Sequence, residues 1–139
     1  MLVLDTNVIA ELMRPVPSAT VIAWLSAQPA SAVWTTALSR AELLHGIALL
    51  PEGKRQGALS TAARDIFELV FKERVLAFTT DAAPHWADIC AGRARGGRPV
   101  SAVDAQIAAI ARVVGGAVVT GNVYDFGGCG VDVVNPWDA

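Results

Sequence analysis

Four carboxylates, Asp5, Glu42, Asp104 and Asp125, stand where helices are expected to begin, and together they could hold a metal ion. Asp5 directly follows the short apolar run Leu2–Leu4. Such an uninterrupted run is typical of a strand covered on both faces, as in a parallel sheet. Ligands bind at the carboxyl edge of such sheets. Whether the other three acids reach that edge is therefore the main question.

Each acid also has a simple explanation as part of a helix cap. Asp5 can itself cap a helix. The other three each follow a potential cap residue by three positions, in the pairs Ser39–Glu42, Ser101–Asp104 and Asn122–Asp125. This spacing matches the capping box, in which the acid reaches back to the amide of the cap residue. For any one acid taken alone, capping is the simpler interpretation.

Taken together, the four acids favour a shared site. Three of them begin helices that follow probable strands, and helix starts after parallel strands share one edge of the sheet. Four carboxylates in one cleft would repel one another and raise one another's pKa. A divalent cation would relieve this repulsion, and oxygen ligands without a His/Cys cluster select Mg²⁺ or Mn²⁺. Such a cation suits attack of activated water on a phosphodiester.

The elements that must position these acids alternate between strands and helices. Strands are predicted over 2–4, 32–36, 75–78, 117–120 and 131–134. Helices are predicted over 6–13, from 18 to just before 29, from about 40 to 50, from after 53 to about 71, from 81 through 90 and from 101 to 114, with a short turn or helix at 122–126. Right-handed crossovers then give one α/β domain, residues 1–139, with a central parallel sheet of about five strands.

Composition limits the functional classes. With 53% apolar and 17% charged residues, the 139-residue chain should be folded. It contains no apolar run of spanning length and no secretory signal, so we expect a cytoplasmic protein with no membrane association. Cys90 and Cys129 are expected to be free thiols. A net charge of −2 excludes a generally basic nucleic-acid binder, and the high apolar fraction predicts an oligomer or partner surface.

Four stretches, in order and spacing, resemble the PIN domain of the FitB/VapC type, the toxin half of bacterial toxin–antitoxin pairs. They are Leu4–Asn7, Ala41–Leu43 with Gly46 after it, Gly97–Ala108 and Thr120–Phe126, and the similarity extends to Val134–Trp137. The resemblance implies a metal-dependent ribonuclease on a parallel α/β/α sandwich. It further implies an RNA substrate, a small cognate antitoxin and a homodimer.

The resemblance also implies roles for individual residues. Asp5 and Asp104 would be the closest ligands of Mg²⁺ or Mn²⁺. Glu42 and Asp125 would complete the metal shell directly or through water, and Asn122 occupies a polar position beside the last acid. One departure stands at Gly121, where members of this type often carry a basic residue.

Further residues could assist the site. Thr6 and Ser101 could orient metal ligands by hydrogen bonds while also capping helices. The Gly-rich loop carries Arg93, Arg95 and Arg98, which either follow an RNA backbone or belong to a solvated loop. Glu11 is expected to be a surface acid.

Two other functional classes lack a residue that they require. A phosphoryl-accepting receiver needs a lysine near the end of a late strand, but Lys54 and Lys72 both fall in a helical stretch. A haloacid-dehalogenase-type phosphatase needs a second aspartate where Asn7 stands. A non-catalytic partner-binding module that retains the PIN fold remains the alternative. Retention of all four acids argues against that module, and metal titration would separate the two.

Overall fold

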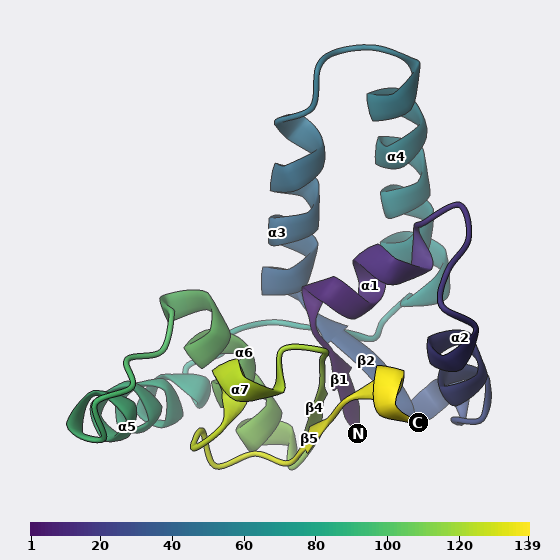
Figure 1. The fold of residues 1–139 in the computed structure, drawn as a ribbon. Helices are drawn as coiled ribbons and strands as arrows, with labels where there is room; N and C mark the ends of the chain where they lie inside the picture. Colours follow the sequence, from purple (N-terminus) through teal and green to yellow (C-terminus); the bar gives the residue numbers. More distant parts are fainter.

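A computed structural model, which describes residues 1–139, shows a five-stranded sheet between layers of helices (Figure 1). All neighbouring strands are parallel, in the order β3-β2-β1-β4-β5. The strands are β1 (Leu2–Leu4), β2 (Val33–Thr36), β3 (Val75–Leu76), β4 (Ala117–Val119) and β5 (Val133–Val134). The predicted α/β fold with about five parallel strands is confirmed, although β3 and β5 are two residues long, shorter than predicted.

The helices connect the strands in the expected alternation. They are α1 (Thr6–Leu12), α2 (Ala19–Ser26), α3 (Ala37–Ala48), α4 (Lys54–Asp65), α5 (Ala82–Arg95), α6 (Ala102–Val114) and α7 (Val123–Phe126). A π-helical turn, Ile66–Val70, continues α4, and short 3-10 turns occupy Ala30–Ala32 and Pro136–Asp138. None of these helices has the length and apolar character needed to span a bilayer.

Both faces of the sheet are buried, as the apolar strand sequences require. Successive side chains of a strand point to opposite faces. Val3 and Val118 accordingly belong to a core cluster with residues of α5 and α6, whereas Leu4 and Val119 belong to a second cluster with residues of α1, α2 and the π-helical turn. All four side chains are fully buried. The molecule is therefore a three-layer α/β/α sandwich.

Helices α3 and α4 form an arm that projects from the sandwich (Figure 1). The start of α3 differs from the prediction. Thr36 caps this helix by accepting a hydrogen bond from the amide of Ser39 at 3.1 Å, so α3 begins at Ala37 rather than near residue 40. The predicted capping box between Ser39 and Glu42 is therefore wrong.

The remaining caps give a mixed result. Asp5, Ser18 and Ser101 each accept a backbone N–H at the start of a helix, as predicted. Asn122 precedes α7 but makes no side-chain capping bond, so the predicted capping role for this residue is wrong. Glu11 is not on the surface either. It is only 6% exposed and pairs with Arg14 at 3.2 Å.

Gly116, just before β4, allows the close approach of the chain at the starts of β1 and β4. A Cβ atom on Gly116 would lie 2.9 Å from the Met1 carbonyl oxygen, a backbone atom that cannot rotate away. We expect Gly116→Ala to lower the free energy of unfolding by about 1–3 kcal/mol, because overpacking forces backbone shifts. Urea denaturation measures the change.

Gly57, within α4, provides the matched control. A Cβ at Gly57 meets nothing within 4 Å, so Gly57→Ala should raise the free energy of unfolding by about 0.5–1 kcal/mol through helix propensity. Equal effects of the two substitutions would show that the contact at Met1 does not limit the packing of β1 against β4.

Candidate active site

Asp5 lies at the carboxyl edge of the sheet between β1 and β4. Its amide donates to the carbonyl of Val119 at 2.9 Å, which continues the pairing of the two strands by one residue. From β1 the chain continues to β2 and β3 on one side of the sheet, and to β4 and β5 on the other, so the topological switch point lies between β1 and β4. In open parallel sheets, ligands bind in the crevice at this switch point. The Asp5 residue is only 5% exposed.

Three donors hold the Asp5 carboxylate. Oδ1 accepts the Thr6 amide at 2.8 Å, and Oδ2 accepts the Thr120 hydroxyl at 2.9 Å and the Asn7 Nδ2 at 3.5 Å. The Thr120 hydroxyl also accepts hydrogen bonds from Asn7 Nδ2 and the amide of Asn122, both at 3.0 Å. A hydroxyl has one donor and two acceptor positions, so Thr120 is fully used. Its orientation, and with it that of Asp5, is therefore fixed.

Neither Thr120 nor Asn7 was identified as a site residue from the sequence. The contact between Thr120 and Asp5 joins residues 115 positions apart, so no local spacing indicates it. The available signal was a polar β-branched residue directly after an apolar strand, at the edge that also carries Asp5. The Asn122 amide contributes to this network, but no hydrogen bond of its side chain is present.

Glu42 approaches the same edge from α3. Its Oε1 accepts the Thr6 hydroxyl at 2.7 Å. Thr6 therefore contacts two of the four acids, with its amide on Asp5 and its hydroxyl on Glu42. The Glu42 residue is otherwise exposed, so its carboxylate can turn toward a ligand.

Asp104 lies in the first turn of α6, and its amide donates to the Ser101 hydroxyl oxygen at 3.1 Å. This position places its carboxylate near the positive end of the helix dipole, which favours a negative charge. Asp125 lies on α7 and is exposed. The capping relation between Ser101 and Asp104 is present as predicted.

The acids are close enough for their charges to contribute to the raised pKa of Asp5 and of Asp104. Burial raises the pKa of Asp5 to about 6; hydrogen bonds from Thr120 and Thr6 oppose this rise, and the charges of Asp104 and Glu42 add to it. Burial also raises the pKa of Asp104, with the Asp125 and Glu42 charges in the same direction and the Ser101 hydrogen bond and the Arg93 charge against it. The structure thus brings the four predicted acids to one region of unfavourable negative charge.

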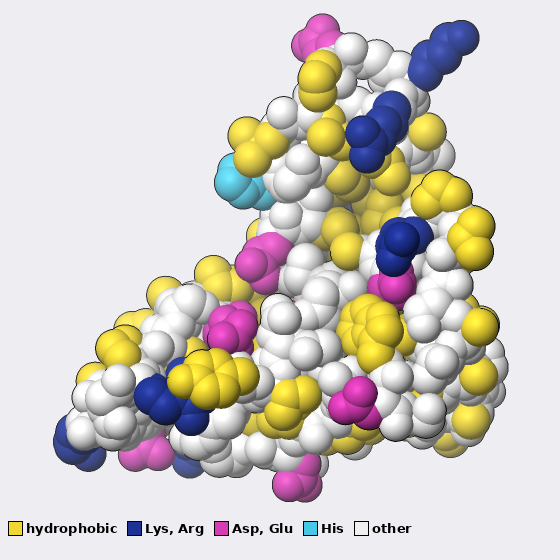
Figure 2. Space-filling view, in the orientation of Figure 1, with side chains coloured by type: hydrophobic (Ala, Val, Ile, Leu, Met, Phe, Trp, Pro, Cys, Tyr) yellow, Lys and Arg dark blue, Asp and Glu magenta, His cyan; other side chains and the backbone are white.

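The chemistry of this region fits a hard divalent cation. Its charged groups are carboxylates, and neither cysteine nor histidine interacts with them. No group of three or more His, Cys, Asp or Glu side chains is close enough to surround an ion in the present arrangement. Glu42 and Asp125 are exposed, and Figure 2 shows acidic side chains over the base of α3 and over α6 and α7. The donor set and its charge therefore suit Mg²⁺ or Mn²⁺.

The three arginines assigned to the Gly-rich loop have different environments, and Arg93 and Arg95 lie in α5 and not in a loop. Arg93 is 7% exposed and donates to the carbonyl oxygens of Arg98, Asp125 and Gly127 at 2.6, 2.8 and 3.0 Å. Arg98 donates to the Tyr124 carbonyl at 2.6 Å. Arg95 is exposed. RNA contact remains a prediction for these residues, but the guanidinium of Arg93 is already engaged inside the molecule.

Trp137 is adjacent to Gly121, where the sequence departs from the family pattern. A Cβ atom at position 121 would lie 3.0 Å from Cζ3 of the Trp137 ring. The Trp137 indole thus leaves little room for a side chain at position 121. A shallow cavity beside it is lined by Asn7, Gly121, Asn122, Asn135 and Trp137.

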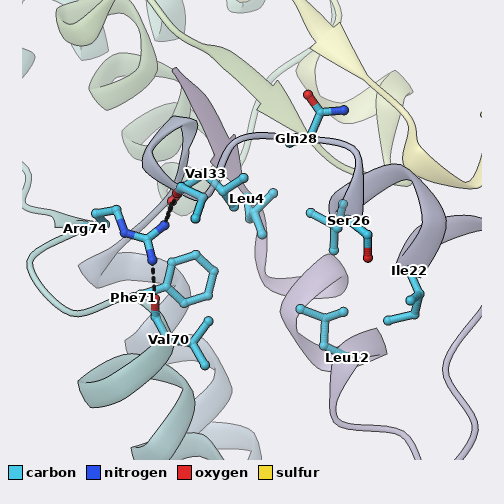
Figure 3. A pocket seen from close by; sticks show the side chains of 11 residues that line it. Leu4, Leu12, Ile22, Ser26, Gln28, Val33, Val70, Phe71 and Arg74 are labelled. Carbon is cyan, nitrogen blue, oxygen red and sulfur yellow. Dashed lines mark hydrogen bonds between the residues drawn. The ribbon is translucent and has the colours of Figure 1, made fainter.

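A separate apolar hollow of about 370 Å³ lies between β1, α1, α2 and the π-helical turn (Figure 3). Arg74 closes one side of it and donates to the carbonyls of Val33 and Val70 next to the Phe71 ring (Figure 3). None of the four acids lines this hollow. It is therefore distinct from the candidate active site.

The comparison with protein families agrees with the observed fold. Residues 2–124 match the PIN domain model. The chain therefore belongs to the PIN domain family.

Individual relatives cover essentially the whole chain. It is similar to the plasmid stability protein StbB of Pseudomonas syringae pv. tomato, with 39% identity over the full length of both chains. It is 36% identical to the VapC ribonuclease Y4jK of Sinorhizobium fredii and 36% identical to toxin FitB of Neisseria gonorrhoeae, in each case over 99% of both chains. A FitAB structure bound to a DNA fragment superimposes with a TM-score of 0.91 at 35% identity, covering 99% of this chain and 96% of that one.

The raised pKa of Asp5 makes stability depend on pH. The unfolded carboxyl should titrate near its ordinary value of 3.8, whereas the folded one titrates at about 6. Between these values the folded state binds more protons, so the free energy of unfolding falls as pH rises and then levels off above about pH 6. In the presence of a chelator, we expect Asp5→Asn to remove this pH-dependent change in the free energy of unfolding, which amounts to about 2–3 kcal/mol. Urea melts from about pH 4 to pH 7 measure it.

Asp81→Asn is the control, because Asp81 is exposed and makes no side-chain capping bond. Its stability curve should run parallel to that of the wild type. A parallel curve for Asp5→Asn as well would mean that Asp5 does not carry the raised pKa.

Proposed function

We propose that this protein is the ribonuclease toxin of a toxin–antitoxin pair and that it cleaves RNA in the cytoplasm with the help of Mg²⁺ or Mn²⁺. The observation that carries the proposal is the buried Asp5 carboxylate, which is held at the switch point of the sheet within the field of the other acids. The names of two relatives, a VapC ribonuclease and toxin FitB, support the activity and the biological role. All of residues 1–139 would form the one PIN-like domain.

Asp5 and Asp104 would hold the cation, and Glu42 and Asp125 would complete its shell directly or through water. When bound, the cation would polarise a phosphate oxygen and lower the pKa of a water molecule for attack on the phosphodiester. Thr120 and Thr6 hold the Asp5 carboxylate in one orientation. Ser101 fixes the first turn of α6, so that Asp104 is presented at the helix start.

The exposed acids would complete the arrangement from the solvent side. Thr6 restrains Glu42 from one side only, which leaves its second carboxylate oxygen free to accept a proton or a hydrogen bond from water. Asp125 would supply a further acceptor from α7. The alternative, a non-catalytic partner-binding module, would retain the fold but show no response to metal.

A protein partner would regulate this site. Solved structures similar to the chain include FitAB and VapBC-5 of Mycobacterium tuberculosis, described as a member of the VapBC family of toxin–antitoxin systems; VapBC-5 has a TM-score of 0.69 and 25% identity over 96% of both chains. We infer a homodimer and a small cognate antitoxin that covers apolar surface. Several large apolar side chains are exposed, among them Leu44, Leu49, Leu69 and Val70. A basic antitoxin side chain among the four acids would neutralise them as a cation does.

The first test of the proposal is the loss of one acid. We expect Asp104→Asn to reduce RNA cleavage by more than about 100-fold, because the neutral amide keeps the helix cap but removes a charge that holds the cation. Cleavage of RNA by purified protein is measured with Mg²⁺ or Mn²⁺, and EDTA should silence the wild type until metal is restored.

Asp81→Asn again serves as the matched control, since it removes the same charge from an exposed position that makes no side-chain capping bond. It should cleave RNA like the wild type. If Asp104→Asn cleaves as fast as the wild type, the activity belongs to a contaminant or to another site.

The second test concerns the partner. We expect the purified chain to form a dimer and to bind the product of the neighbouring gene, because the exposed apolar residues are more stable when covered. Light scattering of the chain alone and of the mixture gives both masses. A monomer with no affinity for that product would contradict the proposed partner and dimer, while leaving the nuclease proposal standing.

A further inference from the structure

An aromatic ring stands exposed beside the candidate active site. Tyr124 is 72% exposed and precedes Asp125 on α7. Most large aromatic side chains bury their rings, because exposing that much apolar surface to water is unfavourable. Figure 2 shows a hydrophobic side chain next to basic ones over α7, on the face that also carries the acids.

One face of the Tyr124 ring is covered by a cation. The guanidinium carbon of Arg98 lies 4.0 Å from the ring centroid, which is cation–π geometry. Arg98 also donates to the backbone carbonyl of Tyr124 itself at 2.6 Å. The guanidinium therefore contacts both the ring and the backbone carbonyl of Tyr124.

A second arginine, Arg93, also stabilises the short helix α7 that carries Tyr124. Arg93 donates to the carbonyls of Asp125 and Gly127, the residues that follow Tyr124 on α7 and just after it. Two arginines, one from α5 and one from the loop after it, thus donate to two carbonyl oxygens of the four-residue helix α7 and to that of Gly127 just after it. Such a short helix gains little from its own hydrogen bonds, so these contacts determine where Tyr124 and Asp125 lie.

We propose that the open face of Tyr124 is a stacking platform for an unpaired RNA base next to the phosphate held at the acids. This inference rests on the proposed ribonuclease function and extends it to how the substrate is bound. Every base has a π-face, so stacking on one ring binds single strands with little sequence preference. The cation beneath the ring and the base above it would form a three-layer stack, which orients the strand toward Asp125.

Substitutions at Tyr124 test the platform. The substrate is a random-sequence pool of single-stranded oligoribonucleotides, cleaved with Mg²⁺ or Mn²⁺. Tyr124→Ala and Tyr124→Leu should raise KM roughly tenfold with kcat changed less than about twofold, because both remove the ring. Tyr124→Phe and Tyr124→Trp should retain the wild-type KM. Val16→Ala, which trims an 82% exposed apolar residue elsewhere, should change neither parameter.

A binding measurement separates the platform from catalysis. Asp104→Asn protein is mixed with the same pool containing 2-aminopurine, whose fluorescence is quenched when the base stacks. The Asp104→Asn protein, which retains Tyr124, should quench the fluorescence. The double variant that carries both Asp104→Asn and Tyr124→Ala should not. Thermal melts of all variants establish that they are folded.

The outcomes are distinguishable. If the wild type cleaves RNA and the ring-free variants match it in KM and in quenching, the platform is wrong and the ribonuclease stands. If quenching requires Tyr124 but no protein cleaves RNA, the nuclease proposal fails and the platform stands. Loss of partner binding in Tyr124→Ala with unchanged KM would overturn the platform in favour of a protein contact. If the wild type neither binds nor cleaves RNA, both the platform and the nuclease proposal are wrong.

Discussion

The candidate active site is built around one buried carboxylate, that of Asp5, at the edge of the sheet. Removing a charged carboxylate from water is costly unless donors replace the lost hydration. Here the Thr6 amide, the Thr120 hydroxyl and the Asn7 amide group do so. They offset desolvation only in part, because the pKa of Asp5 still rises to about 6. The fold therefore holds a group that a cation would stabilise further.

The topology explains why these donors meet. Strands β1 and β4 are neighbours although more than 100 residues separate them, so Asp5 and Thr120, the residues just after each strand, are adjacent. Helix caps and ligand positions are not competing explanations at this edge. Ser101 satisfies the first turn of α6 and hydrogen-bonds Asp104, and one geometry thus both begins the helix and presents the acid.

Local sequence patterns predicted the parts of the fold that local physics determines. The apolar run Leu2–Leu4 indicated a strand buried on both faces and ending at Asp5, and the strand is found there. The start of α3 was predicted wrongly, because both Thr36 and Ser39 are possible caps and only the end of β2 decides between them. The role of Thr120 depends on strand pairing, and the burial of Glu11 depends on how α1 packs; neither is encoded in neighbouring residues.

Arg93 and Arg98 have a structural role that the sequence alone does not indicate. The guanidinium groups of Arg93 and Arg98 supply hydrogen-bond donors to the carbonyl oxygens of Tyr124, Asp125 and Gly127, in and just after α7. The charge of the buried Arg93 side chain also lowers the pKa of Asp104, against the effects of burial and of neighbouring acids. A cation inside the protein thus offsets part of the repulsion among the acids while leaving their exposed side open. This separation allows the carboxylates to be assembled in the folded state before any ligand binds.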